Sequence, residues 1–251
     1  MTGRLVVVHP DADVLAQAAA ARLLTRVLDV QSVRRPVHVV LTGGTVGIKT
    51  LAAAAASPLV GAVDWSGVHL WWGDERFLPT GDPDRNETQA RAALLDALTA
   101  SWGLPAANVH PMVGSDVVGS PEESATAYAA ALAAHAENGA AVPVPAFDVL
   151  MLGMGPDGHV ASLFPGHEGL GADGTTVGVH NSPKPPPERV SLTFDAINAA
   201  REVWVVAAGA EKAEQAAAAL AGHTVTEVPA SGVHGTDRTL WLLDTAASDA
   251  P

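Results

Sequence analysis

The sequence contains no cysteine. This absence excludes disulfides, thiolate nucleophiles and cysteine-based zinc sites, and it fits a reducing compartment. Any nucleophile in the protein must therefore be an oxygen or a nitrogen. No run of about 18 apolar residues is present, and the start, MTGRLVVVHPD, is too short for a secretory signal. We therefore expect a cytoplasmic protein without a membrane segment.

Basic residues are scarce. Lysine and arginine number 14 against 27 aspartates and glutamates, which gives a formal net charge of -13, and only three of the basic residues are lysines. Such a charge disfavours binding to nucleic acid or to an anionic membrane, because both are polyanions. A small anionic ligand would need cations gathered locally around its site.

Short apolar runs alternate with helical stretches along the chain. The runs at residues 5–8, 37–41, 68–72, 147–152, 203–207 and 240–243 predict strands that are buried on both faces. Residues 13–28, 45–56, 86–100, 121–137 and 210–221 are rich in alanine, leucine, glutamine and glutamate, which predicts helices. This alternation predicts an α/β fold: an open, mainly parallel, Rossmann-like sheet with helices on both faces, in a single domain over residues 1–251. Two stretches break the rhythm, at 166–178 and 181–188, and are expected to be connectors or walls of a site.

Ligands of an open parallel sheet bind beyond the carboxyl ends of the strands, so the residues that follow each apolar run are the candidates for a site. After residues 37–41 come Gly43, Gly44 and Thr45 at the start of a helix, where backbone amides can face a phosphate. A simple tight turn is the alternative, because neither the dinucleotide fingerprint nor the P-loop spacing fits.

After residues 68–72 comes GDERFLP. Arg76 presents a planar fork of donors suited to phosphate, and Asp74 or Glu75 could hold that fork rigid. A salt-bridged strand end is the alternative interpretation. Asn86 lies just before the next helix, where capping is favoured over a contact with ligand.

After residues 147–152 comes GMGPDGHVASLFPG, in which glycines let the backbone approach a ligand. Asp157 can orient the imidazole of His159, and an oriented histidine is a good general base near neutral pH. Most of the ten histidines, among them His9, His38, His69 and His223, are better explained by packing or by surface hydrogen bonds.

A proline-rich stretch, SPKPPPER, carries Lys184 and Arg189. A cation on a stiff loop loses little entropy when it binds an anion. A solvated linker is the alternative. His159 and His167 lie across a glycine-proline turn without a carboxylate at a familiar ligand spacing, so we expect no metal. A Ser-His-Asp hydrolase is disfavoured because no G-x-S-x-G elbow follows a strand.

Together, TGGT, GDERFLP with Asn86 downstream, GMGPDGHVASLFPG and SPKPPPERVSLTFDAIN resemble the 6-phosphogluconolactonase family, over a region from Leu41 to Asp244. The resemblance implies hydrolysis of 6-phospho-D-glucono-1,5-lactone in the oxidative pentose phosphate pathway, without a cofactor, on a fold shared with glucosamine-6-phosphate deaminase.

Carried over by position, His159 resembles the base that activates water, and Asp157 its polar partner. Gly43, Gly44 and Thr45 match the phosphate loop, where the family often has serine in place of Thr45. Arg76 and Lys184 match basic substrate contacts, and Arg189 and Asn86 are further candidates. A backbone amide of the glycine-rich turn, Arg76 or Lys184 could each stabilise the oxyanion.

Two other functions compete with the lactonase. A deaminase or isomerase of the same fold would carry a carboxylate soon after the histidine, and the run from Gly158 to Pro165 has none. A sugar-phosphate sensor that reads DNA would need a DNA-binding module, and the first strand begins too early to leave room for one. A phosphorylated sugar lactone is therefore the expected partner, bound by a monomer or a small homo-oligomer.

Overall fold

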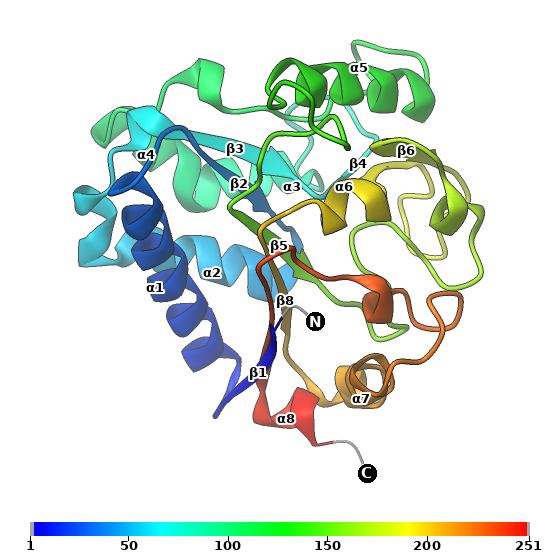
Figure 1. Ribbon diagram of the computed structural model, residues 1–251. Coiled ribbons are helices and arrows are strands. Elements are labelled where there is room, and N and C mark those ends of the chain that lie inside the picture. Colours follow the sequence, from blue (N-terminus) through cyan, green and yellow to red (C-terminus); the bar gives the residue numbers. More distant parts are fainter. Residues whose placement is uncertain (1–2, 250–251) are drawn as a thin grey trace.

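Six strands form one sheet in which every neighbouring pair is parallel, in the order β1-β9-β8-β5-β2-β3 (Figure 1). This computed structural model describes residues 3–249. The strands are β1 (Gly3–His9), β2 (Val37–Leu41), β3 (Val68–Trp72), β5 (Val149–Gly153), β8 (Glu202–Ala207) and β9 (Arg238–Asp244). The six predicted strands and the parallel α/β architecture are confirmed.

Alternate side chains of the five strands other than β1 enter two separate cores. On β2, Val39 and Leu41 pack into the core beneath α1 (Ala12–Gln31) and α2 (Gly44–Ala56). Val40, between them, packs into the opposite core with residues of α5 (Pro121–Ala134), α6 (Phe194–Asn198) and α7 (Ala213–Ala221). Because successive side chains of a strand point to opposite faces, a sheet covered on both sides needs an uninterrupted apolar run. Figure 1 shows α1 and α2 on one side of the sheet and α5, α6 and α7 on the other.

Polar side chains satisfy free amides at the start of several helices, including α1, α5 and α6. Asp11 accepts hydrogen bonds from the amides of Asp13 and Val14, at 2.9 and 2.8 Å, and starts α1. The predicted helix at 86–100 is present as α3 (Asn86–Ala90), a π-helical turn (Arg91–Leu95) and α4 (Asp96–Ser101). Between residues 3 and 249, no helix is both long enough and apolar enough to cross a bilayer.

The prediction that all six strands are buried on both faces is wrong for β1. Leu5, Val6 and Val8 of this strand are between 41 and 49% exposed. β1 lies at the edge of the sheet and pairs only with β9. Apolar composition therefore identified a strand here but not its place in the sheet.

A second, three-stranded antiparallel sheet was not predicted. It has the order β4-β7-β6 and consists of β4 (Asp74–Arg76), β7 (Arg189–Leu192) and β6 (Thr176–Val179). Its register sets Arg76 opposite Arg189. Part of the stretch at 166–178, predicted to be irregular, thus belongs to a strand, and two distant basic residues are brought together.

Glu75, rather than a residue next to the helix, satisfies the start of α3. Its buried carboxylate accepts hydrogen bonds from the backbone amides of Asn86 and Glu87, at 2.7 and 2.9 Å, and from that of Arg76, at 2.8 Å. Burial raises the pKa of Glu75 to about 7, although Arg85 and the three amides act in the opposite direction. This carboxylate fastens α3 to β4.

Replacing Glu75 with alanine is expected to lower the free energy of unfolding by about 1–3 kcal/mol, because buried amides at the start of α3 lose their acceptor. Chemical denaturation would measure this loss. Glu137 is exposed, so Glu137→Ala serves as the control and should change stability by less than about 0.5 kcal/mol. Equal denaturation midpoints for Glu75→Ala and the wild type would contradict the capping role.

Candidate functional site

The strand order reverses at β2, and a hollow of about 300 Å³ lies at this point. From β2 the chain continues to β3 on one side, and β5 pairs on the other side. Open α/β sheets bind ligands at such a reversal, beyond the carboxyl ends of the strands. Eight of the nine predicted site residues line the hollow: Gly43, Gly44, Thr45, Arg76, Asn86, His159, Lys184 and Arg189. The ninth, Asp157, does not line the hollow but contacts Nδ1 of His159.

His159 and Asp157 form a close pair in the turn after β5. Nδ1 of His159 and Oδ1 of Asp157 are 2.5 Å apart, and the histidine side chain is 16% exposed. An Nδ1–H that donates to the carboxylate leaves Nε2 free to accept a proton. Burial alone would raise the pKa of Asp157, but the hydrogen bond from His159 and the charges of His159 and Lys184 outweigh it and lower this pKa.

The backbone at Gly155 makes room for the imidazole. A Cβ atom at this position would lie 2.1 Å from both Cε1 and Nδ1 of His159. The amide of Gly155 also donates to the carbonyl of His159, at 3.0 Å. On another side the ring packs against Phe164, with ring centroids 4.5 Å apart. The orientation of the ring is therefore fixed by packing as well as by Asp157.

Lys184 reaches the same pair from the proline-rich loop. Its Nζ lies 3.4 Å from Nδ1 of His159 and 3.4 Å from Oδ1 of Asp157. Arg189 braces this loop by donating to the carbonyls of Lys184 and Pro185, both at 3.1 Å. The loop that carries Lys184 is therefore held in place, rather than being a free linker.

The helix α2 directs its amino-terminal end at the hollow. Gly43 is the residue before the helix, and no side chain caps it. The unpaired amides and the helix dipole make such an end suited to an anion. A Cβ atom at Gly43 would lie 1.8 Å from Oδ1 of Asn86, so glycine is required here by a close approach between the two loops.

Asn86 does not cap the helix, and the expectation that it does is wrong. The capping position of α3 is occupied by Arg85, and Nδ2 of Asn86 donates to the carbonyl of Asp74 at 2.8 Å. Glu75 supplies the acceptors that a cap would provide. The side chain of Asn86 is thereby free to lie directly against Gly43 at the wall of the hollow.

The sequence analysis suggested that Asp74 or Glu75 could hold the guanidinium of Arg76 rigid. In the structure neither side chain does so. Nη1 of Arg76 donates to the carbonyl of Asp84, at 2.5 Å. The carboxylate of Asp74 instead accepts from Ser162 Oγ at 2.7 Å and lies 4.0 Å from Nη1 of Arg189. Asp74 thus joins the turn after β5 to the second sheet.

Lys212 also lines the hollow, and the sequence analysis did not select it. It directly precedes α7, after the carboxyl end of β8. Burial lowers the pKa of Lys212. Its position after a predicted strand, and the scarcity of lysine, were the features that could have identified it. With Arg76, Lys184 and Arg189, it makes the hollow locally basic in an acidic chain.

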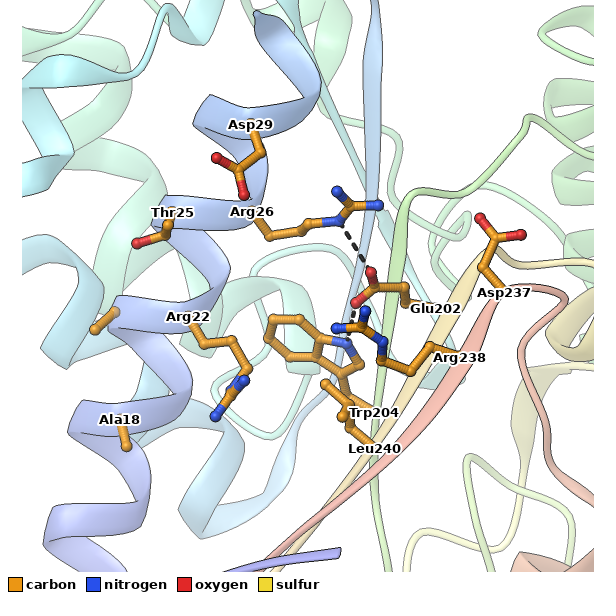
Figure 2. A pocket seen from close by; sticks show the side chains of 11 residues that line it. Ala18, Arg22, Thr25, Arg26, Asp29, Glu202, Trp204, Asp237, Arg238 and Leu240 are labelled. Atoms are coloured by element: carbon orange, nitrogen blue, oxygen red, sulfur yellow. Dashed lines mark hydrogen bonds and ion pairs between the residues drawn. The ribbon is translucent and has the colours of Figure 1, made fainter. Parts of the chain in front are cut away.

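A larger hollow, of about 760 Å³, lies between α1 and the strands β8 and β9 (Figure 2). One ion pair and one indole hydrogen bond cross it, both at the carboxylate of Glu202. Arg26 pairs with Glu202 at 3.0 Å, and the indole of Trp204 donates to the same carboxylate at 2.9 Å. None of the described residues that line it is a histidine, so it lacks the oriented base found at the carboxyl edge.

Fold and site together define an α/β protein with an oriented histidine and a basic hollow at the carboxyl edge of a parallel sheet. The chain belongs to the family of glucosamine-6-phosphate isomerases and 6-phosphogluconolactonases, whose model matches residues 10–241.

A 6-phosphogluconolactonase of Streptomyces coelicolor is 55% identical over 97% of this chain and 93% of its own length. One of Mycobacterium tuberculosis is 44% identical over 96% of both chains. The solved structure of 6-phosphogluconolactonase from Trypanosoma brucei superposes with a TM-score of 0.81 at 28% identity, and covers 99% of this chain and 98% of its own.

Replacing Gly155 with alanine is expected to displace the His159 ring from Asp157, because the new methyl group would occupy the place of the imidazole. In NMR spectra of the histidine side chains, the hydrogen-bonded Nδ1 proton of His159 should shift or disappear. Gly171→Ala is the matched control, because a Cβ atom there meets nothing within 4 Å. An unchanged His159 resonance in Gly155→Ala would refute this role of the glycine.

Proposed function

We propose that this protein hydrolyses 6-phospho-D-glucono-1,5-lactone to 6-phospho-D-gluconate, the second step of the oxidative pentose phosphate pathway. The observation that carries the proposal is the His159–Asp157 pair, 2.5 Å apart, at the edge of a hollow lined by four basic side chains. A lactone is an activated ester, so its hydrolysis requires a positioned water, a base, an oxyanion donor and an anchor for the phosphate. The names of relatives that match nearly the whole chain agree with this reaction.

His159 acts as the general base. With its Nδ1 proton directed at Asp157, Nε2 takes a proton from water as the water oxygen attacks the lactone carbonyl carbon. Asp157 keeps the ring in this tautomer and stabilises the imidazolium that forms, as the aspartate of a catalytic triad does. The tetrahedral intermediate then expels the ring oxygen, which takes the proton back from His159, and the open-chain acid results.

Two lysines divide the negative charges of the substrate between them. Lys184 lies within 3.4 Å of the His159 ring, so it acts at the lactone end, where charge develops on the carbonyl oxygen. Lys212 lies in the same hollow, without a hydrogen bond to the His159–Asp157 pair among the described contacts. Together with the amino-terminal end of α2 at Gly43 and Gly44, it anchors the phosphate.

A deaminase of the same family is the alternative function, and the turn after β5 argues against it. Ring opening of an amino sugar would use a carboxylate near the histidine, and the segment from Gly158 to Pro165 contains none. Ser162, within this segment, is engaged by Asp74 at 2.7 Å.

Replacing His159 with glutamine is expected to lower the turnover number by roughly 10² to 10⁴, the usual effect of losing a general base. Lactone generated in place by a dehydrogenase provides the assay, with spontaneous hydrolysis subtracted. His223→Gln is the control, because this histidine is exposed and does not line the hollow. Near-normal turnover of His159→Gln would remove His159 from the mechanism. Release of ammonia from glucosamine 6-phosphate by the wild type would support the deaminase.

Replacing each lysine with alanine is expected to separate their roles. Lys212→Ala should lower kcat/KM for the phosphorylated lactone roughly 10- to 100-fold, because the substitution removes a charge-assisted hydrogen bond to phosphate. The kcat/KM for unphosphorylated gluconolactone should stay nearly unchanged. Lys184→Ala should lower kcat/KM for both lactones by similar factors.

Lys49→Ala is the control for both lysine variants, because Lys49 pairs with Asp13 at 2.6 Å and lies outside the hollow. A selective loss for the phosphorylated lactone in Lys184→Ala would exchange the two assignments. Equal losses in Lys212→Ala would place that lysine at the lactone end.

A further inference from the structure

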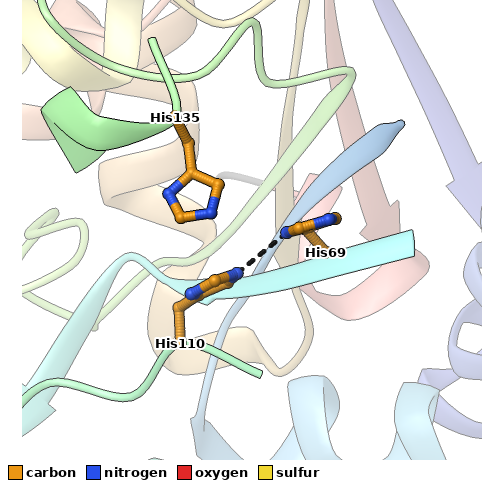
Figure 3. A group of neighbouring side chains, drawn as sticks. All are labelled: His69, His110 and His135. Carbon is orange, nitrogen blue, oxygen red and sulfur yellow. Dashed lines mark hydrogen bonds between the residues drawn. The ribbon is translucent and has the colours of Figure 1, made fainter. Parts of the chain in front are cut away.

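Three histidines from distant parts of the sequence meet at the other end of the sheet (Figure 3). His69 lies in β3, His110 follows the short turn at Ala106–Asn108, and His135 directly follows α5. His69 pairs in register with His38 near the start of β2, whereas the hollow of the proposed lactonase site follows the end of that strand. The histidine cluster therefore belongs to the amino edge of the sheet, away from that site.

The rings of these three residues converge on a small volume. One ring nitrogen from each lies within 4.8 Å of the others, and Nδ1 of His69 is 2.9 Å from Nε2 of His110. Ligands of a tetrahedral zinc ion, at a Zn–N distance of about 2.0–2.1 Å, are spaced by about 3.3 Å. The histidine nitrogens thus need to move by only fractions of an ångström to about 1.5 Å to take such positions.

We propose that His69, His110 and His135 form a binding site for a divalent transition metal ion such as zinc, with water as the fourth ligand. Imidazole nitrogens suit zinc, copper and nickel, whereas magnesium and calcium prefer oxygen ligands, which these three side chains do not offer. His135 is exposed, so solvent reaches the fourth position.

Neighbouring groups orient the rings as a metal site requires. Nδ1 of His135 lies 2.9 Å from the carbonyl of Ala131, so a proton on Nδ1 donates to this carbonyl and leaves Nε2 for a metal. The ring of His110 stacks on Trp71, with centroids 3.9 Å apart and an interplanar angle of 11°. A hydrogen bond such as that of His135 to a carbonyl fixes the orientation of histidine ligands in known metal sites.

His38 is the fourth histidine nearby, but its position makes it a support rather than a ligand. The indole nitrogen of Trp71 donates to Nδ1 of His38 at 3.2 Å, and the ring is buried.

A bound ion would connect three segments of the chain, of which β3 and the segment at His110 are already joined by the hydrogen bond that the amide of His110 donates to the carbonyl of Leu70, at 2.9 Å. β3, the segment after the turn at Ala106–Asn108 and the end of α5 would each supply one ligand. Because the ion binds the folded arrangement of the ligands and not the separated segments, it would stabilise the protein by linkage. The site acts on stability and takes no part in the proposed lactone hydrolysis.

The test measures zinc binding to untagged full-length protein that has first been dialysed against a chelator. Calorimetric titration with ZnCl₂ is expected to show one saturable site per chain, and titration with MgCl₂ none. At a hundredfold excess over the dissociation constant, zinc should raise the melting temperature by about 5 °C or more. His135→Gln, at an exposed position, should weaken zinc binding at least tenfold, and the exposed His223→Gln should not.

Two results would overturn the proposal. One is the absence of saturable zinc binding to the wild type. The other is unchanged zinc affinity in His135→Gln, which would place the ion elsewhere, such as at His159. Should His135→Gln fail to fold, Co²⁺ added to the wild type decides. The intense visible absorption of tetrahedral cobalt is expected, and the weak spectrum of an octahedral ion would contradict a three-histidine site.

Discussion

The common direction of the six strands is the constraint on which the candidate site depends. Because every pair in the sheet is parallel, the loops that follow β2, β5 and β8 leave from one edge. Each loop contributes a different group: an open helix end at Gly43, the imidazole of His159 and the ammonium of Lys212. No single segment contains this combination, and a reversal of any one strand would remove its group from the edge.

The small antiparallel sheet adds to this edge what the parallel strands do not supply. The amide of Leu192 donates to the carbonyl of Gly73 at 2.9 Å, and that of Phe77 donates to the carbonyl of Glu188 at 3.0 Å. These bonds fasten the end of the loop that carries Lys184 to β4. Ser162, in the turn that carries His159, donates to Ser191 of β7 and to Asp74 of β4, and so holds that turn beside the small sheet. Catalysis by fixed charges requires donors that are in place before the reaction, because reorganising them would consume the energy they provide. Arg189 donates to carbonyls of the loop that carries Lys184, so the ammonium of Lys184 is in place before the reaction begins.

Much of the fold could be predicted from the sequence, because strands covered on both faces must be apolar throughout. Val149–Gly153 satisfies this condition throughout, Val37–Leu41 does so at every position except His38, and both were identified. The short strand Asp74–Arg76 consists of charged residues, and its pairing with Arg189–Leu192 depends on contacts that no local pattern encodes. β1 was identified as a strand, but its exposure follows from its place at the edge of the sheet, which composition does not reveal.

The candidate site was predictable to the extent that its residues follow strands. His159 and Gly43 were selected in this way, Lys184 was selected as a cation on a proline-rich loop, and all three line one hollow. The partners of each side chain were not predictable, since they come from other loops. Asn86 faces Gly43 because Glu75, eleven residues earlier, satisfies the helix start in its place. The cluster of His69, His110 and His135 was still harder to predict, because its members are remote in sequence and only the folded chain brings them together.

The protein and its proposed substrate are both negatively charged, and the different distances of the acidic and basic groups from the substrate explain how binding is still possible. At physiological ionic strength the Debye length is about 8 Å, so exposed acidic groups far from the hollow are largely screened from an approaching anion. Inside the hollow, Arg76, Lys184, Arg189 and Lys212 act at contact distance, where partial burial weakens the screening. A net charge of -13 therefore does not exclude a phosphorylated ligand. It does remove the long-range attraction that would draw in large polyanions, so recognition is confined to anions small enough to enter between the loops.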